Sequence, residues 1–194
     1  MAQQVRFLIK IFILCSFISC INNEVKQVKL QLVSNTDTSL HLKDGLLLYD
    51  NNLFSGTVYT LYAETTDTAE IKNYIEGKEN GTWKKFYPNH EIKELREFDK
   101  GKKVGKMIGF WENKKLMLEY NFIDDEFNGT CKEWNYSGQL IREMNYVNGH
   151  EEGTQKMFYD NGKTRSNYLM KDGKRFGLLG TKNCVNVSDS IFKK

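Results

Sequence analysis

A glycine recurs at an almost constant interval along most of the chain. Six of them are separated by 25, 24, 24, 24 and 24 residues: Gly56, Gly81, Gly105, Gly129, Gly153 and Gly177. A fixed period in this range indicates stacked supersecondary units, each of which buries its apolar surface against its neighbours. The chain is therefore expected to be a repeat array.

Each unit has the features of a β-hairpin. Asn-rich or Gly-rich reversals, "YPNH", "WENK", "NYSG" and "YDNG", occur at the same place in successive units. Asn and Gly accept positive φ, and Pro88 fixes φ at a turn position. Apolar side chains then alternate, as at Leu116, Leu118, Tyr120 and Phe122, which predicts a half-buried strand. No apolar stripe of period 3.6 survives across the turns, so helices are disfavoured.

A single hairpin is only marginally stable in water, so the units must stack in register. The predicted fold is all-β, an elongated twisted antiparallel sheet of stacked hairpins with a period of about 24 residues. We divide the chain into an N-terminal signal (1–20), a tether with an N-terminal cap (21–43), the repeat array (44–180) and a C-terminal tail (181–194).

The N-terminal stretch "MAQQVRFLIKIFILCSFISC" is typical of an export signal. Arg6 and Lys10 precede the apolar run Ile11–Ile18, and Cys20 follows at the expected cleavage point. "FISC" resembles the bacterial lipobox, with Phe17 where that motif prefers Leu. This resemblance implies lipidation (palmitate) of Cys20 and a membrane-anchored lipoprotein on the periplasmic or surface side of a bacterial cell envelope. The alternatives are an ordinary cleaved signal or a fortuitous apolar start.

The charge balance argues against nucleic-acid binding. The whole chain has 28 Lys and Arg against 25 Asp and Glu; removing residues 1–20 takes away Arg6 and Lys10 and leaves 26 against 25, a net charge of +1. Binding to phosphates requires a basic surface, and this excess is too small to supply one.

Few residues suggest catalysis or metal binding. His41, His90 and His150 lie far apart along the array without a metal-ligand motif, and we interpret them as solvated loop residues. No cofactor is expected. Cys131 occupies an apolar column and is interpreted as a small filler, while Cys184 lies two units further on. Four strand spacings, about 19 Å, are too long for a disulfide between Cys131 and Cys184 unless the tail folds back, so Cys184 is a possible free or intermolecular thiol.

Two segments, "NGTWKKFYPNHEIKELREFDKGKKVG" and "EGTQKMFYDNGKTRSNYLMKDGKRFG", resemble the MORN-repeat variant family, whose bacterial members are often labelled YwqK-type antitoxins. The resemblance covers residues 44–180. It implies an elongated antiparallel sheet that serves as a binding or scaffolding surface. It does not by itself fix an activity.

Aromatic residues on the first strand of each unit are the remaining candidate site. Because neighbouring residues of a strand face opposite sides, adjacent aromatic columns would place rings on both faces of the sheet. Either all of them are structural, or one face presents an aromatic groove to a partner. The candidate residues are Trp83, Phe86, Tyr87, Phe110, Trp111, Trp134, Phe158 and Tyr159.

Three functions are compatible with these features. The first is a non-catalytic envelope lipoprotein whose repeat surface binds a protein or another envelope polymer. The second is an antitoxin or immunity protein, which a neighbouring toxin gene would support. The third is a redox enzyme acting through Cys184, whose activity would be lost in Cys184→Ser.

Overall fold

The computed structural model describes residues 30–178, and within them every regular element is a β-strand. The main sheet has the strand order β1-β5-β6-β8-β9-β10-β11-β13-β14-β16-β17-β18. Its hairpins pair β5 (Gly56–Leu61) with β6 (Thr68–Ile75), β8 (Gly81–Phe86) with β9 (Ile92–Asp99), β10 (Lys102–Phe110) with β11 (Leu116–Ile123), β13 (Gly129–Trp134) with β14 (Leu140–Val147), and β16 (Gly153–Phe158) with β17 (Thr164–Lys171).

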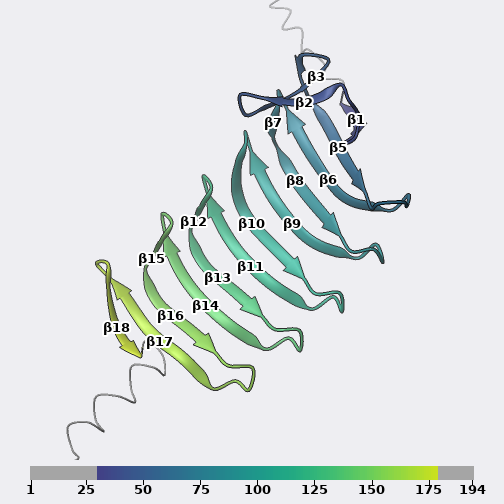
Figure 1. Ribbon diagram of the computed structural model, residues 1–194. Helices are drawn as coiled ribbons and strands as arrows, with labels where there is room; N and C mark the ends of the chain where they lie inside the picture. The colour runs from purple at the N-terminus through teal and green to yellow at the C-terminus, as the bar shows by residue number, and fades with distance from the viewer. Residues whose placement is uncertain (1–29, 179–194) are drawn as a thin grey trace, which may run out of the picture.

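The remaining strands of this sheet are short. Three two-residue strands pair antiparallel with the ends of β6, β11 and β14: β7 (Lys78–Glu79), β12 (Glu126–Phe127) and β15 (His150–Glu151). Strands β1 (Gln31–Ser34) and β18 (Lys174–Leu178) lie at the two edges. Figure 1 shows the hairpins side by side in one curved layer. The predicted all-β stack of hairpins is confirmed, with strands of six to nine residues.

Two kinds of turn reverse the chain at the two ends of the hairpins. Between units, tight turns have positive φ at both central residues, as at Lys100 (50°) and Gly101 (89°). This is the type I′ geometry, whose twist matches that of the flanking strands. The longer loops within units each carry one left-handed residue, which is His90 (65°) in one copy and Gly138 (90°) in another. His90 is therefore a turn residue, as the sequence predicts.

The recurrent glycines stand where the chain bends into the first strand of each unit. Gly81, Gly105, Gly129 and Gly153 have φ of 72°, 62°, 92° and 79°, a region that side chains other than glycine rarely adopt. A Cβ at Gly81 would meet nothing within 4 Å. Glycine is therefore favoured there by the positive φ and not by a lack of space for a side chain. At Gly56 a Cβ would lie 2.2 Å from the backbone oxygen of Gln31, so close packing is the reason.

A large side chain pairs directly with each of these glycines. Phe98 lies opposite Gly81, Phe122 opposite Gly105 and Tyr146 opposite Gly129. The absent side chain leaves room for the ring, and Phe98 and Phe122 are each only 8% exposed. We call the side of the sheet that carries these residues the glycine face. It holds the apolar packing of the array without a second layer.

The opposite side, the threonine face, is defined by Thr57, Thr82, Thr130 and Thr154. Its side chains connect neighbouring strands by hydrogen bonds. Thr130 Oγ1 donates to Asn145 Oδ1 (2.7 Å), and Asn145 Nδ2 donates to the backbone oxygen of Thr154 (2.5 Å). Thr57 and Asn73 repeat the arrangement, with Asn73 Nδ2 donating to Thr82 O (2.7 Å). The threonine face therefore links hairpins through polar groups at three junctions, where Asn73, Asn121 and Asn145 each donate to the backbone of the next hairpin.

A third set of contacts joins the units at their loop ends. The hydroxyl of Tyr87 donates to the backbone oxygen of Phe110, one unit later (2.9 Å). Tyr62 makes the same bond to Phe86 (2.5 Å), and the indole nitrogen of Trp111 makes it to Trp134 (3.0 Å). The column of aromatic residues six positions after the glycine thus fastens successive hairpins together.

Removing one of these bonds should weaken the array measurably. We expect Tyr87→Phe to lower the free energy of unfolding by about 1 kcal/mol, the net value of a typical hydrogen bond. Urea denaturation followed by circular dichroism measures this change. Tyr136→Phe is the control, because Tyr136 is 58% exposed and loss of its hydroxyl should cost less than about 0.5 kcal/mol. Equal costs in the two variants would contradict the role given to Tyr87.

The N-terminal end of the array differs from the sequence-based division. Strand β1 adds to β5 in parallel, so part of the expected tether belongs to the sheet. A separate three-stranded sheet follows, made of β2 (Leu40–Lys43), β3 (Leu46–Tyr49) and β4 (Asn52–Leu53). The expected boundary between residues 43 and 44 falls inside it, because Asp44 and Gly45 form the tight turn between β2 and β3.

This small sheet closes the first unit of the array. Phe54, directly after β4, is 1% exposed and forms a core cluster with Val33 and Val58. Its ring lies against Tyr49 and Tyr74, at centroid distances of 6.2 and 6.1 Å. Figure 1 shows the three strands at the end of the array that carries β1 and β5. The expected signal and the expected tail (1–20 and 181–194) lie outside the described residues.

Candidate functional site

One row of side chains on the glycine face runs across the strands from β6 to β17, and each member pairs with the next. We call it the central row. The row begins with three charged residues, continues with two uncharged ones, and then has a residue pair of opposite charge. Two uncharged residues end it. In order, the row consists of Glu70, Lys85, Glu94, Gly109, Leu118, Glu133, Arg142, Met157 and Ser166.

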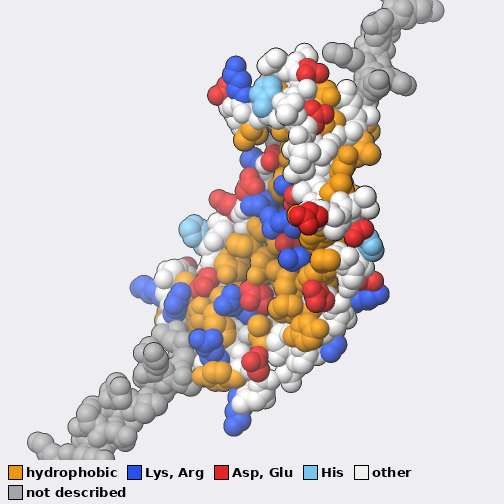
Figure 2. All heavy atoms as spheres, turned by 45° about the vertical axis from the view of Figure 1, so that its right-hand side comes forward, with side chains coloured by type: hydrophobic (Ala, Val, Ile, Leu, Met, Phe, Trp, Pro, Cys, Tyr) orange, Lys and Arg blue, Asp and Glu red, His pale blue; other side chains and the backbone are white. Residues whose placement is uncertain are grey.

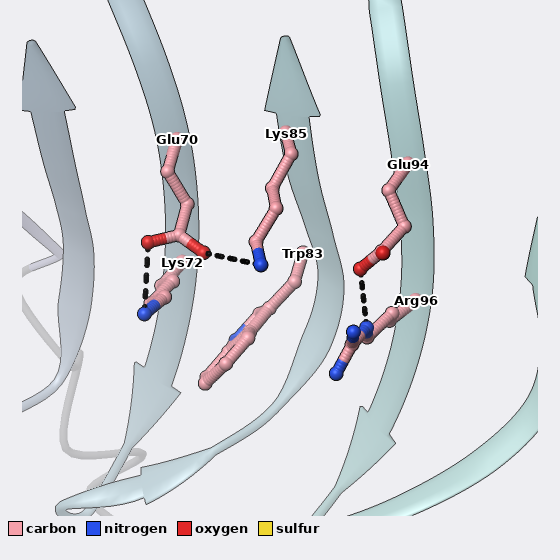
Figure 3. Close-up of a pocket in the computed structure, with 6 residues that line it drawn as sticks. All are labelled: Glu70, Lys72, Trp83, Lys85, Glu94 and Arg96. Carbon is pink, nitrogen blue, oxygen red and sulfur yellow. Dashed lines mark hydrogen bonds and ion pairs between the residues drawn. The ribbon is translucent and has the colours of Figure 1, made fainter. Parts of the chain in front are cut away.

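A hollow of about 80 Å³ opens on the N-terminal half of this row. Trp83 lies in it, half-buried, with its ring 4.3 Å from that of Phe98 and 4.8 Å from the ammonium group of Lys72. The indole nitrogen of Trp83 donates to the backbone oxygen of Asn73 (3.3 Å), which fixes the ring. We call this site the Trp83 hollow. Figure 3 shows the six residues that line it: Glu70, Lys72, Trp83, Lys85, Glu94 and Arg96.

The charged side chains around Trp83 form ion pairs that differ in the distance between the two charged groups. Lys72 lies 2.8 Å from Glu70, whereas Lys85 lies 3.8 Å from the same carboxylate, beyond hydrogen-bond distance. Arg96 donates to Glu94 through Nε, so this bond leaves the two terminal guanidinium nitrogens unused. Three cations and two anions give the hollow a net charge of +1. Lys85, which is beyond hydrogen-bond distance of Glu70, and Arg96, through its terminal guanidinium nitrogens, have capacity for an additional anionic partner.

A second hollow, of about 170 Å³, lies further along the same face. Its floor is apolar, because Cys131 and Met144 are each 4% exposed. Glu133 accepts hydrogen bonds from the hydroxyl of Tyr120 (2.6 Å) and from Arg142 Nη1 (2.9 Å), so its charge is already matched. We call this site the Cys131 hollow. Its lining residues are Tyr120, Phe127, Cys131, Glu133, Arg142, Met144 and Tyr146.

The environment of the Cys131 hollow suppresses acid–base chemistry. Burial raises the pKa of the Cys131 thiol, and burial together with the hydrogen bond to Glu133 raises the pKa of Tyr120. Both groups are therefore held in their neutral forms. A neutral thiol is a poor nucleophile, so Cys131 serves as the apolar filler that the sequence predicts.

This protection of Cys131 can be measured. In the folded protein at pH 8 we expect Cys131 to react with iodoacetamide at least about tenfold more slowly than in urea, because its raised pKa and its burial both oppose thiolate attack. Mass spectrometry of the peptide that contains Cys131 gives both rates. Reaction in the folded protein as fast as in urea would show that the thiol is accessible and ionised.

The structure does not bring the eight candidate aromatic residues together. Trp83 lies on the glycine face, whereas pairing places Phe86, Phe110, Trp134 and Phe158 on the threonine face, each directly after a bulge in its hairpin. Tyr87 and Trp111 lie at the loop ends and bond the next hairpin, and Tyr159 there is 38% exposed. Cys20 and Cys184 lie outside the described residues.

Sequence reasoning missed the charged neighbours of Trp83. The two-residue alternation of a strand, applied to polar as well as aromatic positions, predicts that Lys85 and Arg96 share a face with Trp83. Counting two and four residues from Gly81 gives Trp83 and Lys85, and pairing then brings Arg96 and Glu94 opposite them.

Within residues 30–178 no group of three or more His, Cys, Asp or Glu side chains is placed to hold a metal ion. His90 lies 3.7 Å from Asp67 in the loops and lines neither of the two hollows. No helix in the same range could span a bilayer.

Comparison with known proteins supports the repeat assignment over part of the chain. Residues 127–148 and 151–172 match the model of the MORN repeat variant, two segments of 22 residues each. They coincide with two adjacent hairpins, β13–β14 and β16–β17. The chain therefore contains at least two MORN-variant repeats. No curated protein sequence matches the chain.

Among solved structures, the chain is similar to a crystal structure of a mutant of S. aureus TarM in complex with Fondaparinux, alpha-GlcNAc-glycerol and UDP. The two are 17% identical, and 57% of this chain aligns with 21% of that one at a TM-score of 0.33. A second structure of TarM matches at 18% identity and a TM-score of 0.32, over the same shares of the two chains. The chain thus spans about a fifth of the length of TarM.

Proposed function

We propose that the chain is a non-catalytic binding module that holds a partner protein on its glycine face. The observation that carries the proposal is the central row, in which side chains from different hairpins combine into two hollows on one side of the sheet. Such a site exists only when the hairpins are stacked. Figure 2 shows apolar side chains gathered over the repeat strands, with basic and acidic groups among them. This mixture is suited to contact with another protein.

The threonine face is a weaker candidate. Its Thr and Asn side chains already bond one another and the neighbouring backbone, as Thr130 does with Asn145. Groups that are satisfied within the sheet would have to give up these bonds in order to bind a partner. The glycine face retains cations with capacity for a further partner, at Lys85 and Arg96.

Two adjacent residues allow the two faces to be compared directly. Leu118 pairs with Gly109 on the glycine face, and Glu119 pairs with Ile108 on the threonine face. We would place a photo-crosslinking amino acid at position 118 or at position 119 and irradiate cells that express the full chain. We expect a discrete crosslinked protein from position 118 that is absent from position 119.

The two positions share the same strand and expression level, so differences in folding or abundance affect them equally. Equal crosslinking from both positions, or crosslinking from position 119 alone, would overturn the assignment of the glycine face. No crosslink from either position in intact cells would overturn the binding function itself.

The location of this module is a second part of the proposal. The basic start, the short apolar run and Cys20 support attachment of the chain to a bacterial envelope membrane through a lipid on Cys20. Metabolic labelling with an alkyne-bearing palmitate should mark the wild-type protein and not Cys20→Ser. Equal labelling of the two proteins, or of neither, would exclude lipidation at Cys20.

A further inference from the structure

We infer that the partner presents a peptide segment that lies across the strands, with an acidic side chain in the Trp83 hollow and an apolar side chain in the Cys131 hollow. This inference rests on the proposed function and gives the partner's contact a chemistry. It follows from the different composition of the two hollows and from their separation along one row.

The Trp83 hollow fits a carboxylate. Its net charge is +1. Lys85 lies two residues after Trp83 on β8, and Arg96 of β9 pairs with Trp83. The side chain of Lys85 is 43% exposed and that of Arg96 is 29% exposed, so both are reachable while partly shielded from water. A carboxylate that accepts hydrogen bonds from the ammonium group of Lys85 and the terminal guanidinium nitrogens of Arg96 would form charge-assisted bonds, which are stronger than those between neutral groups.

The Cys131 hollow fits an apolar side chain. Cys131 and Met144 are its most buried lining residues, and Phe127 lines it too, with its ring 5.4 Å from that of Tyr120 and 5.2 Å from that of Tyr146. The one acidic group, Glu133, is bonded by Tyr120 and Arg142. An apolar side chain placed here would be removed from water without separating a charge from its partner.

The distance between the hollows sets the length of the segment. Lys85 on β8 and Glu133 on β13 belong to the same row, and four strand spacings separate them, which amounts to about 19 Å. An extended peptide covers this distance in about six residues and a helix in about thirteen. Gly109, which has no side chain, and Leu118 lie in the row between the two hollows, so the path between them is free of charge at these positions.

Selection from a random peptide library tests this chemistry even while the partner is unidentified. We would immobilise the full folded chain and select from a phage-displayed library of 16-residue peptides. Parallel selections would use Lys85→Glu and the matched control Lys84→Glu, which places the same charge on the opposite face. The enriched peptides would then be synthesised, and their affinities measured by fluorescence anisotropy.

We expect enriched peptides to carry Asp or Glu separated from an apolar residue by about six or about thirteen positions. Lys85→Glu should weaken their binding at least about tenfold and Lys84→Glu less than about twofold. Changing the peptide's acid to its amide, or its apolar residue to Ser, should each weaken binding at least about tenfold.

Three results would overturn the inference: no enrichment, enrichment without acidic residues, or equal loss of affinity in the two lysine variants. If position 118 nevertheless crosslinks a cellular protein, the glycine face remains the binding face and only the acidic and apolar chemistry is wrong. If crosslinking fails as well, the proposed function is wrong.

Discussion

Replacing Phe122 with Ala is expected to destabilise the protein by about 3–5 kcal/mol, the range for removing a buried aromatic ring. Phe122 is 8% exposed, its ring lies 4.8 Å from that of Phe127, and it fills the space opposite Gly105. In a single-layered sheet no second layer can move in to replace the lost contacts. The cavity would therefore remain at the centre of the array.

Urea denaturation measures this loss, and Ile123→Ala is its control. Ile123 follows Phe122 on the same strand but is 58% exposed, so its truncation should cost less than about 1 kcal/mol. If the two variants lost the same stability, Phe122 would not belong to a buried interior, and the packing assigned to the glycine face would be wrong.

Gly56→Ala is the second substitution with a large expected effect, a loss of about 3 kcal/mol, at the upper end of what overpacking costs. The new Cβ would lie 2.2 Å from the backbone oxygen of Gln31 and 2.9 Å from the ring of Phe54. The backbone of β1 cannot rotate away as a side chain can, so β1 must separate from β5. We expect a loss of stability together with faster hydrogen exchange of the amides of residues 31–34.

Gly81→Ala separates this steric effect from backbone strain. A Cβ at Gly81 meets nothing within 4 Å, but φ is +72°. We expect it to cost about 1–2 kcal/mol through conformation alone, without changing exchange in β1. Protection of β1 in Gly56→Ala equal to that in the wild-type protein would contradict the close packing described at that position.

The repeat itself was predictable because its determinants are local. The glycine interval and the Asn-rich or Gly-rich turns specify where the chain bends, and those bends alone define hairpins. The N-terminal end was not predictable in the same way. Parallel addition of β1 to β5 joins segments that are 25 residues apart, and no local signal in the sequence encodes this pairing.

The candidate site was predictable only in part, for a geometric reason. Strict alternation of side chains along a strand assigns each column of aromatic residues to one face of the sheet. A bulge between Lys85 and Phe86, however, changes the pairing at the end of the strand. Tyr87 then lies beyond the strand and bonds the next hairpin. Trp83 lies before the bulge, where alternation holds, and this residue alone of the eight lines one of the two hollows described above.

The most direct test of the account is a pair of distances measured across the array. Lys84, Lys132 and Lys156 belong to one row of the threonine face, and four strand spacings separate the first two residues while six separate the first from the last. Spin labels on cysteines at these positions, in a chain whose four native cysteines are replaced by Ala, would be measured by double electron–electron resonance. A single-layered stack predicts about 19 Å from position 84 to 132 and about 29 Å from 84 to 156. Two similar distances, or a shorter one to position 156, would contradict it.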